Sequence, residues 1–197
     1  MGRKGEETRQ RILDHAVRVA STDGLAGLSI GALAGSLKMS KSGLFAHFRS
    51  KEHLQLQVVG AMLTRYQERV LVKSYDAPRG VARLRALFAA WLTWASDASM
   101  PGGCPIIAAG VELDDQPGPV RELMVDGMQQ LHQRLRALYR EAVERGELSG
   151  GLAPADFTFR MHAIILGTHH ALRLRGDTRA LARARAAFED LLERAKR

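Results

Sequence analysis

The sequence of 197 residues contains one cysteine, Cys104. A single cysteine excludes an internal disulfide framework, and it also excludes the zinc sites that are built from paired thiolates. A protein without disulfides fits a reducing compartment, so we expect it to work in the cytoplasm. Cys104 directly precedes Pro105, where a helix is expected to start, and a thiolate is favoured at a helix N-terminus. A redox-sensing role for Cys104 is therefore one hypothesis, and plain packing is the more common role of a lone cysteine.

The sequence also lacks a long apolar run. Its uncharged stretches are short; residues 86–96 and 98–111 are two of the longer ones, and the second is interrupted by Pro101, Gly102, Gly103 and Pro105. Both are too short or too broken to cross a bilayer, which needs about 20 consecutive apolar residues. The basic start of the chain has no apolar segment behind it, so we expect neither an export signal nor a membrane partner.

Basic residues outnumber acidic ones, 29 to 21, and the surplus lies at the two ends. Residues 1–55 carry nine basic and five acidic side chains, and residues 173–197 carry eight and four. The segment between them is neutral. A basic end on a neutral body suits a polyanionic partner such as nucleic acid, although a solvated surface would show the same composition.

Proline is scarce, with six residues, and no stretch alternates polar and apolar side chains in the manner of a strand. Apolar residues instead recur at spacings of three and four, which predicts an all-α protein. The predicted helices cover residues 6–23, 30–37, 40–48, 51–72, 79–97, 105–114, 119–145, 154–175 and 178–196. The short basic helices predict one domain over residues 6–66, and the longer helices predict a second over residues 67–197.

Residues 29–48 predict a helix-turn-helix, because two short helices are separated only by Lys38 and Met39. The first helix would brace the second, which would enter the major groove of DNA. Helix N-termini at Ser29, Ser40 and Ser50 offer free N–H groups to phosphates, with lysines close by. The DNA-contacting residues predicted from this arrangement are Ser29, Lys38, Ser40, Lys41, Ser42, Gly43, Ala46, His47 and Lys51.

The segment SKSGLFAHFRSKEHL, residues 40–54, resembles the recognition helix of TetR-family regulators, whose usual pattern is SKGxLYxHFxSKExL. The resemblance extends back through residues 29–34 to residues 8–13. Three residues depart from the pattern: Lys38 replaces the glycine of the turn, Ser42 replaces a glycine, and Phe45 replaces a tyrosine that commonly contacts phosphate. Phe45 can then offer only packing, for example against a thymine methyl group. Lys38 is expected in a left-handed conformation at a cost of roughly 1 kcal/mol.

The resemblance implies a helical C-terminal domain that dimerises and binds a small organic effector. Residues 102–121 also resemble a stretch seen in one C-terminal subgroup of these regulators, without indicating a ligand. Apolar stripes in the last two helices predict that both pair with their twins in a homodimer. The predicted interface residues are Ala163, Gly167, His170, Leu174, Leu181, Ala184, Phe188 and Leu191. Large, adaptable side chains that could line an effector pocket, or simply the core, are Met62, Phe88, Trp91, Trp94, Met100, Ile107, Met124 and Met128.

Two rival functions have some support in the sequence. Residues 27–31 match the Gly-x-Ser-x-Gly pattern of serine hydrolases, with Asp114 and His132 following Ser29 in the right order. That pattern requires a strand and a sheet, which an all-helical chain does not supply. A metal sensor could use His162, His169, His170, Asp114 and Asp115, but His162 and His169 would lie about two helical turns apart, roughly 10 Å.

The sequence therefore predicts a non-enzymatic transcription regulator without a cofactor. Its expected partners are double-stranded DNA carrying a pseudo-palindromic operator, a second copy of itself, and a small effector that releases a repressor from the DNA. A regulator that works without an effector, and an activator, remain as alternatives.

Overall fold

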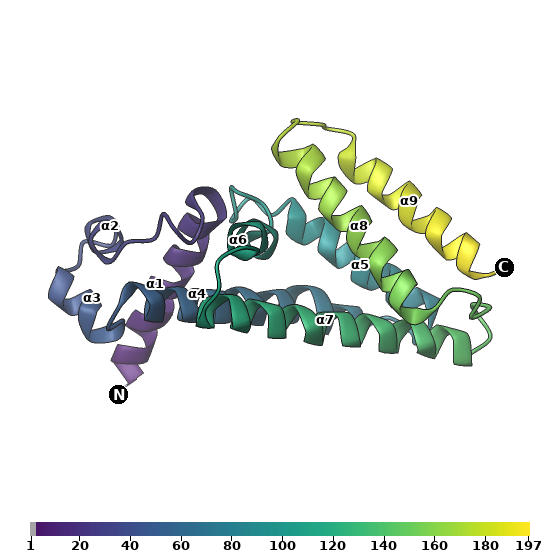
Figure 1. The fold of residues 1–197 in the computed structure, drawn as a ribbon, viewed down its shortest axis with the longest axis horizontal. Coiled ribbons are helices and arrows are strands. Elements are labelled where there is room, and N and C mark those ends of the chain that lie inside the picture. The colour runs from purple at the N-terminus through teal and green to yellow at the C-terminus, as the bar shows by residue number, and fades with distance from the viewer. Residues whose placement is uncertain (1–2) are drawn as a thin grey trace. The chain divides into compact units, whose positions relative to one another are not determined.

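A computed structural model describes residues 3–197, and all of its regular structure is helical (Figure 1). The helices of the described part are α1 (Arg3–Asp23), α2 (Ile30–Ser36), α3 (Lys41–His47), α4 (Lys51–Tyr66), α5 (Val81–Ala95), α6 (Pro105–Leu113), α7 (Pro119–Glu144), α8 (Pro154–Arg173) and α9 (Ala180–Ala195). A π-helical segment, η1 (Gln67–Val72), follows α4. The predicted all-α fold is confirmed. No helix in the described part of the chain is long and apolar enough to span a membrane.

Serine side chains determine where the short helices begin. Ser29 Oγ accepts a hydrogen bond from the Ala32 amide at 3.1 Å, and Ser40 Oγ accepts one from the Gly43 amide at 3.0 Å. Ser50 Oγ accepts one from the His53 amide at 3.0 Å, at the start of α4. Each hydroxyl satisfies an N–H that the first helical turn would leave unpaired. The three predicted N-caps are confirmed.

Lys38, the residue directly after the C-cap of α2, has a φ of 53°, in the left-handed region. This is the conformation expected from its position in the turn, where the family pattern has glycine. The turn is held by backbone hydrogen bonds, from the Lys38 amide to the Gly35 carbonyl at 3.2 Å and from the Met39 amide to the Ala34 carbonyl at 2.9 Å. Only the three residues 38–40 therefore separate the C-cap of α2 from the first residue of α3.

The helix predicted to run to Val72 keeps α-helical geometry only as far as Tyr66. It then continues as η1, whose turns contain more residues than α-helical turns. Tyr66, Val70 and Leu71 are all buried, so side chains four and five positions apart face the same core. This spacing fits a π-helical turn better than a regular α-helix.

The chain forms two compact units. One contains the chain up to Arg65 together with Asp97–Asp126, and the other contains Tyr66–Ser96 and Gly127–Arg197. The segment with α6 belongs to the first unit because α6 packs against α1. The helix lengths suggest a single boundary at residue 66. The first unit differs from that division because it also includes residues 97–126.

Stacked aromatic rings mark the core of the second unit. The rings of Phe88 in α5 and Phe188 in α9 stack with their centroids 4.2 Å apart. Tyr139 in α7 stacks on Phe157 in α8 at 4.4 Å, and its hydroxyl donates to the Leu152 carbonyl at 2.9 Å. In the same unit α8 and α9 pack along each other in opposite directions (Figure 1). These contacts tie α5, α7, α8 and α9 into one core.

Candidate nucleic-acid interface

Helix α3 is anchored by two buried side chains and leaves the rest of its surface open. Leu44 and the C-cap residue Phe48 are both 0% exposed. Lys41, Ser42, Phe45 and Ala46 are exposed, with 51% of Phe45 accessible. The face predicted to read DNA is therefore the open one. It carries a cation, a hydroxyl, a methyl group and an aromatic ring, all of which can contact base edges or the sugar-phosphate backbone.

The two phenylalanines of this segment, Phe45 in α3 and Phe48 at its C-cap, differ in exposure. Phe45 is exposed to solvent, whereas Phe48 is fully buried. The Arg9 guanidinium lies 6.0 Å from the Phe48 ring centroid, and the rings of His47 and His53 each lie 6.3 Å from it. Phe48 thus holds the end of α3 against α1 and α4.

The hydroxyls at the start of α3 already interact with each other. Ser40 Oγ, which caps the helix, lies 3.2 Å from Ser42 Oγ. Gly43 leaves room for the same cap: a Cβ atom at this position would lie only 3.0 Å from Ser40 Oγ. The serine at residue 42 and the glycine at residue 43, which reverse part of the family pattern, therefore both contribute to the cap. Ser42 keeps an exposed side chain for an outside partner.

Three lysines surround the helix-turn-helix, and one of them has an internal partner. Lys38 and Lys41 are exposed. Lys51 is exposed as well, but its ammonium group donates a hydrogen bond to the Ala26 carbonyl at 2.7 Å. Lys51 is therefore held beside the loop between α1 and α2, where its remaining N–H groups are available to a phosphate.

Sequence reasoning missed two side chains of α1 that brace the helix-turn-helix. His15 Nε2 lies 2.8 Å from Ser36 Oγ of α2, and Arg9 donates to Gln57 Oε1 of α4 at 2.5 Å. The partners are 21 and 48 residues apart in the sequence. No local pattern relates such residues, and only the packing of α1 across α2 and α4 brings them together.

The side chains predicted to line an effector pocket divide between the two units. Met62, Met100 and Met124 are buried in the first unit, where Ile107 is half-buried. Phe88, Trp91 and Trp94 are buried in the second unit, where Met128 is half-buried. Phe88 and Trp91 pack together with their ring centroids 6.0 Å apart, so both also serve the core.

Trp94 differs from its neighbours because its polar atom is unsatisfied. The side chain is 2% exposed, and Nε1 has no hydrogen-bond partner among the described residues. Its ring meets that of Tyr66 edge to face, with the centroids 5.8 Å apart. A buried N–H without an acceptor is costly, and such groups often mark a place where a ligand or water binds.

Helix α8 presents an apolar stripe to solvent. Its exposed members are Phe159 at 74%, Leu166 at 42% and Leu174 at 74%, together with Ala163 and His170. Their spacings of three and four residues place them on one face of the helix. Of the predicted interface residues in α9, Ala184, Phe188 and Leu191 are buried in the protomer and Leu181 is half-buried.

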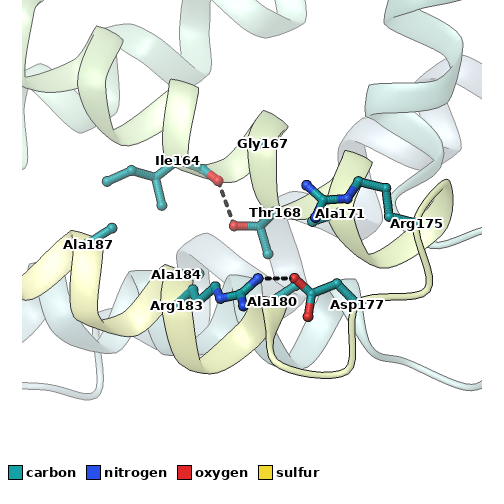
Figure 2. Close-up of a pocket in the computed structure, with 10 residues that line it drawn as sticks. All are labelled: Ile164, Gly167, Thr168, Ala171, Arg175, Asp177, Ala180, Arg183, Ala184 and Ala187. Carbon is teal, nitrogen blue, oxygen red and sulfur yellow. Dashed lines mark hydrogen bonds and ion pairs between the residues drawn. The ribbon is translucent and has the colours of Figure 1, made fainter.

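Beside this stripe, α8 and α9 line a hollow of about 260 Å³ (Figure 2). Gly167 faces open space, because a Cβ atom there would meet nothing within 4 Å. An ion pair between Arg183 and Asp177 lies at one end of the hollow, and the Thr168 hydroxyl is turned back to the Ile164 carbonyl. Most of the remaining lining is aliphatic.

The residues of the rival functions do not assemble into reactive sites. Ser29 caps α2, in a chain without a sheet among its described residues. Within residues 3–197, no three His, Cys, Asp or Glu side chains are grouped so that they could hold a metal ion. The structure instead pairs His132 with His162, at 3.1 Å between Nε2 and Nδ1. Burial lowers the pKa of both imidazoles, with Arg136 adding to the effect on His132.

Two family models match the chain. The model described as bacterial regulatory proteins, tetR family, matches residues 12–58. The model described as the tetracyclin repressor-like C-terminal domain matches residues 80–188, more than half of the sequence. No curated protein matches the chain.

Several solved structures have the same fold. A TetR transcriptional regulator from Chloroflexus aurantiacus is 24% identical, with a TM-score of 0.86 over 98% of this chain and 96% of that one. A regulator from Saccharomonospora viridis in complex with choline is 20% identical, with a TM-score of 0.82 over 95% and 96% of the two chains. AibR, solved with isovaleryl coenzyme A and operator DNA, is 20% identical, with a TM-score of 0.71 over 95% and 97%.

Proposed function

Since this chain belongs to the TetR family of transcription regulators, which bind DNA and are not enzymes, we propose that it is a homodimeric repressor released from a pseudo-palindromic operator by a small molecule. The observation that carries the proposal is the open face of α3 above its buried anchors Leu44 and Phe48. A helix of seven residues is too short to be stable alone, so its position depends on those anchors.

The proposed DNA contacts fall into two groups. Lys38, Lys41 and Lys51, with the capped N-termini of α2 and α3, would bind phosphates and set the register of the protein on the duplex. Ser42, Phe45 and Ala46 would read base edges in the major groove, Phe45 through an apolar contact such as a thymine methyl group. Ser29, Ser40, Gly43 and His47 complete the proposed surface.

The exposed stripe of α8 supports dimerisation. Phe159 and Leu174 are each 74% exposed, and an apolar surface of this kind is usually covered by a partner. A second copy would place its own stripe against the same face, as two-fold symmetry requires. Ala163, Gly167 and His170 lie in the same region. The small side chains at residues 163 and 167 would let the two α8 helices approach closely. Phe188 and Leu191 would stabilise this face from inside the protomer.

The unpaired indole N–H of Trp94 supports an effector site in the second unit. An effector with a hydrogen-bond acceptor beside an apolar or aromatic body would satisfy that N–H and pack against Tyr66. The regulators solved with choline and with isovaleryl coenzyme A show that similar folds bind small molecules of different classes. Repression follows as the proposed outcome, because bound protein on an operator blocks transcription.

Sedimentation of the protein with a fluorescent operator duplex tests the dimer and its role together. The duplex is first selected from a random DNA library by the wild-type protein. The wild type should sediment as a dimer and bind the duplex as two chains. Phe159→Asp and Leu174→Asp should give monomers with at least tenfold weaker operator binding. Val111→Asp, which changes an exposed valine of α6, is the control and should leave both unchanged. A monomeric wild type that binds the duplex one chain at a time would contradict the proposal.

A further inference from the structure

We propose that Glu112 of α6 is a positioning residue that holds the loop between α1 and α2, so that operator affinity depends on where α6 lies. The inference rests on the proposed DNA-binding function, and it adds a residue outside the helix-turn-helix to that function. Glu112, the loop and the helix-turn-helix all belong to the first compact unit.

The Glu112 carboxylate binds two successive backbone amides of the loop. Oε2 accepts a hydrogen bond from the Leu25 amide at 2.6 Å, and Oε1 accepts one from the Ala26 amide at 2.5 Å. Successive N–H groups that converge in this way form a concave site for an anion, and hydrogen bonds to a charged acceptor are stronger than neutral ones. The donor and acceptor residues are 86 and 87 positions apart in the sequence.

The carbonyl groups of the same two residues accept hydrogen bonds from side chains of α4. Lys51 donates to the Ala26 carbonyl at 2.7 Å, and Gln55 donates to the Leu25 carbonyl at 2.9 Å. Side chains of α4 and α6 therefore satisfy all four backbone polar groups of Leu25 and Ala26. The Leu25 side chain is 1% exposed and anchors the loop in the core. The loop is thus fixed by two helices that are remote from each other in the sequence.

Gly24 leaves room for the carboxylate. Its φ is +72°, and a Cβ atom on it would lie 2.5 Å from Glu112 Oε2. Any other residue would meet both the backbone strain and the crowding. The absence of a side chain at Gly24 therefore permits both the turn after α1 and the contact with Glu112 of α6.

A second contact joins α6 to α1. The Gly102 amide, just before α6, donates to Ser21 Oγ at 3.1 Å in a buried position. A Cβ atom on Gly102 would lie 1.5 Å from the Ser21 carbonyl oxygen, so the two backbones touch. Ser21 and Glu112 thus bind the two ends of the α6 segment to the end of α1 and the loop that follows it.

This arrangement gives the loop a direct effect on the DNA-binding helices. Only Gly27 and Leu28 separate Ala26 from Ser29, the N-cap of α2. Residues 96–104 connect α6 to α5, and residues 114–118 connect it to α7. A displacement of α6 that withdraws the carboxylate would leave two amides unpaired and release the start of α2. Operator affinity would fall without any change in the residues that contact DNA.

Glu112→Gln tests the inference in the full-length protein, because an amide retains the size of the side chain and only one of the two acceptors. Asp115→Asn is the matched control, since it removes the same charge from an exposed residue three positions away. Hydrogen exchange is measured at the Leu25 and Ala26 amides. Affinity is measured for the duplex selected by the wild-type protein and for an unrelated duplex of equal length.

For Glu112→Gln we expect exchange at Leu25 or Ala26 to become roughly tenfold faster, with a similar loss of affinity for the selected duplex. Affinity for the unrelated duplex should change by less than about twofold, because non-specific binding depends on charge and not on the orientation of α3. A general loss of folding would lower both affinities together. Asp115→Asn should match the wild type in every measurement.

Unchanged exchange at both amides in Glu112→Gln would overturn the inference. Faster exchange with wild-type affinity for the selected duplex would overturn the coupling to DNA binding. If the wild-type protein selects no sequence at all, the proposed function fails, and the exchange measurement still decides whether Glu112 holds the loop.

Discussion

His132 Nε2 in α7 lies 3.1 Å from His162 Nδ1 in α8, and the two rings meet edge to face with their centroids 4.9 Å apart. A hydrogen bond at this distance requires one imidazole to donate and the other to accept, so at least one ring is neutral. Both rings are partly buried, and burial is the main reason why each pKa lies below its ordinary value of 6.5. We therefore expect this pair to make the stability of the second unit depend on pH.

Stability should fall as the pH is lowered through 6.5. Well above that pH both imidazoles are neutral in the folded and unfolded chains, and protonation does not reduce the stability. Below it the unfolded chain takes up protons before the folded chain does, because the folded pKa values are lower. His169, whose pKa is also lowered mainly by burial, acts in the same direction. Urea midpoints at pH 7.5 and 5.5 measure the loss, which should be smaller in His132→Gln. An equal loss in the variant contradicts the account.

The stacked pair Phe88 and Phe188 should dominate the stability of the core around α9. Both side chains are 2% exposed, and their rings are inclined by only 12°. Phe188→Ala should lower the free energy of unfolding by about 3–5 kcal/mol, because it removes the ring and leaves a cavity. Phe188→Leu should lower the free energy of unfolding by clearly less, because leucine fills more of the cavity than alanine does. Urea unfolding at one protein concentration compares the two, and equal losses would show that the ring is not packed as described.

Replacing Lys38 by glycine should raise the stability of the protein and lower its affinity for DNA. Its φ of 53° is strained for a residue with a side chain, so Lys38→Gly should raise the free energy of unfolding by about 1 kcal/mol. The same change removes an exposed ammonium group from the proposed phosphate-binding surface, and operator affinity should fall. Thermal unfolding measures the gain in stability, and DNA titration of the same sample measures the loss of operator affinity. A variant that is less stable than the wild type would show that the lysine side chain itself stabilises the turn.

Lys41 and Ser42 should separate phosphate binding from sequence reading. Lys41→Ala should weaken all DNA binding and reduce the slope of log K against log salt by about 0.9, the value for one lost phosphate contact. Ser42→Ala should retain the slope and change the preferred sequence. Lys73→Ala, at an exposed lysine in the second unit, is the control and should leave the slope intact. Equal slopes for Lys41→Ala and Lys73→Ala would remove Lys41 from the interface.

Local chemistry accounts for the parts of the fold that the sequence predicts well. The hydroxyls of Ser29 and Ser40 and the ring of Pro105 act within one helical turn, so the starts of α2, α3 and α6 follow from a few residues each. The left-handed Lys38 is equally local. The segment that forms the open face of α3 is contiguous, which explains why it can be identified from sequence.

Contacts between distant residues could not be predicted in this way. Glu112 is an ordinary acidic residue near the end of a helix until α6 packs against α1 and places it on the Leu25 amide. His132 and His162 are 30 residues apart, and their pairing depends on how α7 and α8 are rotated. The burial of Phe188 inside the protomer and the exposure of Phe159 likewise depend on which face of each helix the other helices cover.

Footprinting of the wild-type protein on the DNA that it selects from a random library tests the central claim most directly. The account predicts protection of two related half-sites in inverted orientation, with their centres about 34 Å apart along the duplex. Protection should be lost in Lys41→Ala at moderate salt and in the Phe159→Asp variant. Failure to enrich any sequence, or tight protection of one isolated half-site by a single chain, would contradict the account.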